Sequence, residues 1–181
     1  ANLYSYAFRN EEAEKYMKKA IQLGSTNFEG YYVLGLVCFR TQRYDEAENY
    51  LKKIIQLDSA YMEAYNVLAL IYSNTQQYEK AVGEFENIIR IDSTYGRAWV
   101  NLGIICLMTD QPEKAEAAFL KTLQLDKNNP YLHHFAYLGL GLLDLQNQRF
   151  GEAEDRFNKA LELNPNYPDA HNSLALLSIR T

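Results

Sequence analysis

The side chains in this sequence that most readily do chemistry are those of Cys38, Cys106, His133, His134 and His171. The cysteines could form a disulfide or part of a metal site, and histidine is a general base and a common metal ligand. His133 and His134 are neighbours, however, and neighbouring side chains of a helix point about 100° apart. No Cys, Asp or Glu stands at metal-ligand spacing beside them. The sequence therefore predicts neither a zinc site nor a catalytic histidine.

The short motifs that mark other kinds of active site are absent too. The sequence contains no Gly-rich phosphate loop, no nucleophile elbow and no helical His-Glu-x-x-His. Its carboxylates recur with the repeat described next, which is typical of solvated helix faces and of groups that complement the helix dipole. We therefore expect no enzymatic activity, no cofactor and no bound metal.

A repeat of 34 residues organises the chain. The alanines that mark it are separated by 34, 34, 34 and 38 residues: Ala13, Ala47, Ala81, Ala115 and Ala153. A second series places a small residue after a leucine: Gly35, Ala69, Gly103, Gly141 and Ala175. Each unit is thus two amphipathic segments of about 13 residues, which are too short to be stable alone and would bury their apolar faces by stacking.

This pattern resembles the tetratricopeptide repeat family, in which aromatic residues flank Leu-Gly on the first helix and follow Ala on the second. The unit that starts at residue 62 matches at Tyr65, Leu68, Tyr72, Ala81 and Phe85. The resemblance covers essentially the whole chain and implies an all-α fold, a right-handed superhelical solenoid of antiparallel helix hairpins. It implies one domain with the repeats 1–27 (partial), 28–61, 62–95, 96–129, 130–167 (with a four-residue insert) and 168–181 (first helix only).

Several local expectations follow from this register. The small residues are predicted to lie where two helix backbones approach closely, because a larger side chain there would cost about 1–3 kcal/mol. Cys38 and Cys106 occupy equivalent positions two units apart, roughly 20 Å by helix stacking, so we expect both to be buried in the core without a disulfide between them. Ser59 and Ser93 replace the family's unit-end proline and could cap the next helix. The insert, within 129–133, is expected to lengthen the first helix of its unit rather than to bulge the loop.

The resemblance also implies a ligand groove on the first helices, which line the concave face in this family. The ninth position of each unit is aliphatic throughout: Leu36, Leu70, Ile104, Leu142 and Leu176. The twelfth adds Phe39, Leu107 and Leu145, while polar contacts around the groove would come from Tyr32, Arg40, Asn66, Arg97, Asn101 and Asn172. We hypothesise that this surface receives an amphipathic helix or an extended apolar segment. The alternative is that neighbouring helices already cover these side chains.

Composition limits the partners. The net charge is −5 without a block of like charge, so nucleic acid is not expected. No run of 18 apolar residues and no signal peptide is visible, so we expect no membrane span and a cytoplasmic location, although the chain lacks an initiator Met and could be a fragment or a processed product.

We predict a scaffold or adaptor that binds another protein or peptide. Three alternatives stay open. One is an assembly protein that associates with itself through uncapped ends, since Leu174, Leu176, Leu177 and Ile179 would leave apolar surface uncovered. The others are the regulatory repeat region of a larger enzyme and a helper in bacterial secretion or pilus assembly.

Overall fold

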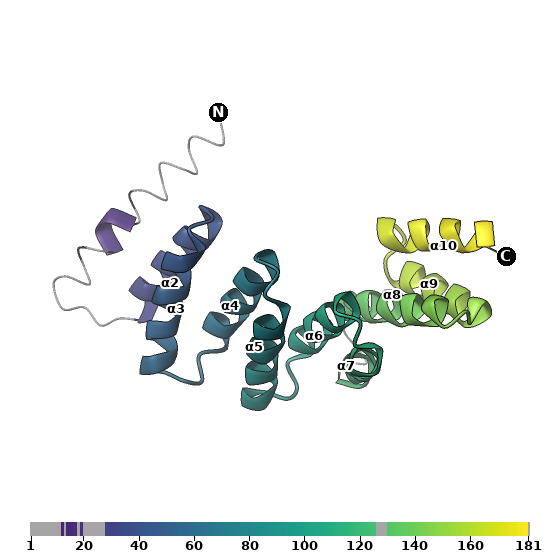
Figure 1. The fold of residues 1–181 in the computed structure, drawn as a ribbon, viewed down its shortest axis with the longest axis horizontal. Helices are drawn as coiled ribbons and strands as arrows, with labels where there is room; N and C mark the ends of the chain where they lie inside the picture. Colours follow the sequence, from purple (N-terminus) through teal and green to yellow (C-terminus); the bar gives the residue numbers. More distant parts are fainter. Residues whose placement is uncertain (1–11, 13, 18, 20–27, 126–129, 181) are drawn as a thin grey trace. The chain divides into compact units, whose positions relative to one another are not determined.

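A computed structural model describes residues 12, 14–17, 19, 28–125 and 130–180. These residues form helices joined by short turns and include no strand, which confirms the all-α prediction (Figure 1). Ala13, most of the partial repeat 1–27 and Asn129 lie outside the described residues. The chain divides into two compact units, residues 1–87 and 88–181. None of the described helices is long and apolar enough to cross a membrane.

The first unit is built on a helix hairpin. Helix α2 (Phe28–Arg40) pairs with α3 (Tyr44–Leu57), and α4 (Met62–Asn74) packs against both. Helix α5 (Tyr78–Ile91) begins in this unit and ends in the next. Their apolar faces share one core, which contains Leu51, Ile54, Leu68, Ile71 and Tyr72. Each helix therefore depends on its neighbours for burial, as stacked short hairpins require.

The second unit repeats this arrangement. Helix α6 (Gly96–Met108) pairs with α7 (Pro112–Leu125), and α8 (Pro130–Gln146) pairs with α9 (Phe150–Leu163). Helix α8 also contacts α6 and α7, while α10 (Pro168–Arg180) packs on α9 and α8. Helix α8 has 17 residues where α6 has 13, so the insert extends the helix, as predicted.

Small residues hold the hairpins closed. A methyl carbon built on Gly103 would lie 2.6 Å from a ring carbon of Phe119, and one on Gly141 would lie 2.5 Å from the ring of Phe157. The described alanines of the repeat have no exposed surface: Ala47, Ala81, Ala115 and Ala153. The predicted close approach of the paired helices is therefore confirmed.

The turn inside each of the four repeats between residues 28 and 167 uses a residue that the sequence does not flag. One residue per turn has φ between 55° and 60°, and none of them is glycine: Gln42, Gln76, Asp110 and Gln148. A positive φ is unfavourable for such residues. Backbone hydrogen bonds fix the turn, since the next residue donates to a carbonyl five positions back, as Gln77 N does to Tyr72 O at 2.7 Å.

Two local expectations have different outcomes. Both cysteines are buried and form no disulfide, as predicted. The helix-capping role of Ser59 and Ser93 was wrong, because the residues before α4 and α6 are tyrosines that make no side-chain capping bond. The serines contribute their carbonyl oxygens instead. Ser59 O accepts from Tyr65 Oη at 3.1 Å, and Ser93 O accepts from Trp99 Nε1 at 2.9 Å. The aromatic side chain at the fourth position of the helix thus reaches back and fixes the turn before it.

Candidate functional site

In the first unit the predicted groove residues lie on α2 and α4. Leu36, Phe39 and Tyr32 are half-buried and pack against the core of that unit. The ring of Tyr32 meets that of Tyr61 edge-on, with 5.6 Å between centroids. Leu70 remains 36% exposed. Neighbouring side chains therefore cover part of the aliphatic row here and leave Leu70 accessible.

The second unit shows the same division. On α8, Leu142 and Leu145 are half-buried and pack against the cluster formed with α9 and α10. Leu107 on α6 is half-buried as well. Ile104 on α6 is 37% exposed and Leu176 on α10 is 58% exposed. The accessible members of the row are therefore Leu70, Ile104 and Leu176, and we call these three the exposed row.

The polar residues predicted around the row differ in exposure. Asn66 and Asn101 are half-buried, whereas Arg40, Arg97 and Asn172 are exposed. Exposed side chains of this kind fix the orientation of a bound segment more than they strengthen its binding. No group of three or more His, Cys, Asp or Glu among the described residues is placed to hold a metal ion.

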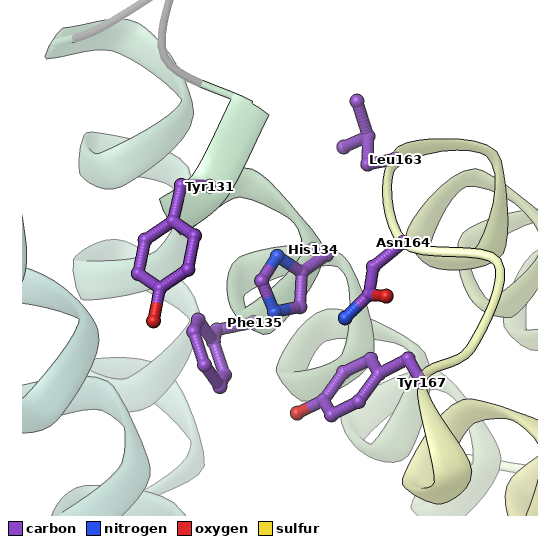
Figure 2. Close-up of a pocket in the computed structure, with 6 residues that line it drawn as sticks. All are labelled: Tyr131, His134, Phe135, Leu163, Asn164 and Tyr167. Carbon is purple, nitrogen blue, oxygen red and sulfur yellow. The ribbon is translucent and has the colours of Figure 1, made fainter.

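Sequence reasoning missed a pocket of about 470 Å³ at the start of α8 (Figure 2). Its lining consists of Tyr131, His134, Phe135, Leu163, Asn164 and Tyr167, and we call it the aromatic pocket. His134 is only 4% exposed, whereas Tyr131 is 62% exposed. Burial, reinforced by the charge of Asp169, raises the pKa of Tyr167 to about 12, so its hydroxyl stays protonated at neutral pH. The signal in the sequence was the aromatic-rich insert itself.

A second pocket of about 330 Å³ lies on the other side of the extra turn of α8. Tyr131 and Leu132 of that turn line it together with Asp92 and Thr94 of the loop before α6 and Arg97 at the start of α6. Hydrogen bonds from the hydroxyl and backbone N–H of Thr94 lower the pKa of Asp92. Tyr131 thus contributes to both pockets.

Ionic contacts that involve carboxylates lie outside these two pockets. Asp144 on α8 is buried and pairs with Arg149 Nη2 at 2.6 Å and Arg156 Nε at 3.3 Å. Burial alone would raise the pKa of Glu48, but hydrogen bonds from Lys52 and Tyr72 outweigh it and the pKa is lowered. The bond from Tyr72 to Glu48 and that from Arg156 to Asp144 join adjacent helices, whereas the Lys52–Glu48 pair lies within α3. None of these residues lines either pocket.

Sequence comparison identifies the family. Three models, each described as a tetratricopeptide repeat, match residues 28–61, 63–95 and 94–166. Together they cover well over half of the chain, which therefore belongs to the tetratricopeptide repeat family. Proteins of this kind are scaffolds for protein–protein interaction. No curated protein sequence gives a significant match.

Solved structures agree with this fold. MamA is 25% identical with a TM-score of 0.77, and the match covers 86% of this chain and 89% of that one. YrrB, described as a tetratricopeptide repeat protein with an unusual peptide-binding site, is 19% identical with a TM-score of 0.77, over 96% and 88% of the two chains. The pilF protein of Pseudomonas aeruginosa is 25% identical with a TM-score of 0.74, over 84% and 68%.

Proposed function

We propose that this protein is a non-catalytic scaffold that binds an amphipathic helix or an extended apolar segment of another protein along the exposed row. The observation that carries the proposal is the aliphatic ninth position of the repeats, at which Leu70, Ile104 and Leu176 keep 36%, 37% and 58% of their surface exposed. Exposed aliphatic side chains are the kind of surface that receives the apolar anchors of a bound amphipathic helix.

The half-buried residues at the ninth and twelfth positions have a supporting role. Leu36, Phe39, Leu142 and Leu145 pack against the cores beneath them, so they hold the first helices in place and offer only their outer edges to a ligand. A substitution of Leu142 would therefore weaken the fold and the groove together. The exposed row is the better target, because its side chains can change at little cost to stability.

The test uses two matched triple variants. Peptides of about 18 residues, long enough to span several helical turns, are selected against the wild-type protein from a random library. One variant carries Leu70→Ser, Ile104→Ser and Leu176→Ser. The control carries Leu57→Ser, Ile91→Ser and Leu120→Ser, which replace exposed leucine and isoleucine side chains on the second helices of the repeats.

We expect the row variant to lose affinity for the selected peptides about 100-fold, since each leucine contributes about 1 kcal/mol when a ligand covers it. The control variant should bind as wild type does in the same anisotropy titration. Both should keep their helical circular dichroism. Equal loss in both variants, or none in the row variant, would contradict the proposal.

One observation favours a second candidate, association of the chain with itself. On α10, Ile179 is 81% exposed close to Leu176, so the outer side of this helix presents an apolar surface. Light scattering over a concentration series tests this directly. A mass that rises with concentration in wild type and not in Ile179→Ser would support self-association, and a monomer at every concentration would exclude it.

A further inference from the structure

The aromatic pocket is formed where three elements of the second unit meet. The first turns of α8 supply Tyr131, His134 and Phe135, the end of α9 supplies Leu163, and Asn164 and Tyr167 belong to the turn before α10 (Figure 2). Its volume of about 470 Å³ lies in the range of pockets that hold small ligands, and its lining is mostly apolar with a few polar groups, as in such sites.

Most of the ring pairs around this pocket meet edge to face, while His134 and Phe135 lie tilted at 34°. Tyr167 lies 4.8 Å from His134 at 88° and 5.7 Å from Phe135 at 77°, and Tyr131 lies 6.2 Å from Phe135 at 77°. Aromatic rings prefer this arrangement at these separations. An aromatic ring of a ligand that entered the pocket would extend this arrangement of rings and would cover Tyr131, which is 62% exposed.

The repeat pattern does not require an aromatic residue at 131 or 135, although Phe135 packs against the core of this unit. At the second position of the first helix, the other repeats carry charged residues: Glu29, Glu63, Arg97 and Asp169. When the repeats are aligned on Gly141 and its equivalents, Phe135 is the residue of α8 that stands at this second position. The extra turn of α8 precedes it and adds Tyr131. This repeat alone among the described ones therefore combines an apolar second position with an additional aromatic residue in front of it.

The polar groups of the lining suit a neutral guest with amide or hydroxyl groups. None of the six residues carries a carboxylate, an ammonium or a guanidinium group. The backbone of Asn164 is engaged in the turn, where its N–H donates to Ala160 O at 2.9 Å and its carbonyl accepts from Tyr167 N at 3.1 Å. Its carboxamide points toward His134 across the pocket (Figure 2) and can bond a peptide group at the mouth.

We propose that the aromatic pocket receives one aromatic side chain, such as that of tryptophan or tyrosine, from the partner polypeptide. The inference deepens the proposed function, because it assumes a polypeptide partner and assigns one residue of that partner to one place on the chain. The pocket is separate from the exposed row, since it contains none of the three residues of the row.

The experiment uses N-acetyl-tryptophanamide as the probe, so that it needs no knowledge of the partner. The full chain, labelled with ¹⁵N and ¹³C, is titrated with this amide and, separately, with N-acetyl-leucinamide and N-acetyl-argininamide. Two variants are compared with wild type. Tyr131→Ala removes the exposed wall, and Phe135→Glu introduces the residue type found at this position in two other repeats, which the fold accepts there.

With the tryptophan amide we expect chemical-shift changes that saturate and are confined to residues 131–135 and 163–167. Tyr131→Ala should lower the affinity for this amide about threefold to tenfold, because one aromatic contact is lost. Phe135→Glu should abolish the shift changes with the helical spectrum unchanged. Absence of saturable shifts, equal binding of the leucine amide, or tighter binding of the arginine amide would overturn the inference. The row variant should bind the probe as wild type does, so failure here is distinct from failure of the scaffold proposal.

Discussion

Replacing Gly103 by alanine tests how tightly the hairpin of α6 and α7 is closed. The added methyl carbon would lie 2.6, 2.8 and 2.9 Å from three ring carbons of Phe119, distances that require something to shift. The ring cannot retreat freely, because Phe119 has no exposed surface and its ring also lies against Gly139 on α8.

Two effects of opposite sign determine how Gly103→Ala changes the free energy of unfolding. Alanine is favoured over glycine inside a helix by about 1 kcal/mol. Overpacking of a rigid core costs about 1–3 kcal/mol, and a methyl group this close to a confined ring belongs at the upper end. We therefore expect Gly103→Ala to lower the free energy of unfolding by about 2 kcal/mol, which corresponds to about 4–8 °C in Tm for a chain of this size.

Gly83 provides the matched control. It lies inside α5, and a methyl carbon built on it would meet nothing within 4 Å, so Gly83→Ala keeps only the favourable effect. Urea denaturation followed by circular dichroism, with the m-value compared among the proteins, should show the two variants about 3 kcal/mol apart. A further Phe119→Leu substitution should reduce the cost of Gly103→Ala. If Gly103→Ala is as stable as Gly83→Ala, the close approach of these helices is not what holds the hairpin.

Two other predictions concern carboxylates, one buried at Asp144 and one half-buried at Glu84. Asp144→Asn should destabilise the protein by about 1–2 kcal/mol, because it weakens the bonds to Arg149 and Arg156. The partial exposure of the two arginines limits the loss. Thermal unfolding measures the change, and an unchanged Tm would refute the prediction. Burial raises the pKa of Glu84 above its ordinary value of 4.5, so its contribution to stability is present below that pH and is lost as pH rises through the folded pKa. Glu84→Gln should therefore stabilise the fold at pH 7, by less than about 1 kcal/mol, and have no effect at low pH, which urea titrations at the two pH values would show.

The repeat made much of the fold predictable, because it reports on packing that recurs. Gly103 and Ala115 were assigned to a close helix approach from their spacing alone, and the structure places the ring of Phe119 against Gly103. The longer α8 followed from counting four extra residues. The left-handed residue of each turn was not predictable in the same way, since Gln76 and Gln148 carry none of the usual signs of a positive φ.

The candidate site was less accessible to sequence reasoning. The register assigns Leu70 and Leu142 to equivalent positions, yet Leu70 is exposed and Leu142 packs against a core. Coverage depends on the size of side chains on adjacent helices, which the period does not encode. The aromatic pocket combines the start of α8 with the end of α9, about 30 residues later in the chain, a contact that spacing alone does not reveal.

The most direct test of the scaffold proposal is a methyl NMR titration of the wild-type protein with a selected peptide. The account predicts that the methyl resonances of Leu70, Ile104 and Leu176 shift and saturate together, while those of Leu57 and Leu120 on the second helices stay in place. Shifts confined to the second helices, with the exposed row unaffected, would contradict it.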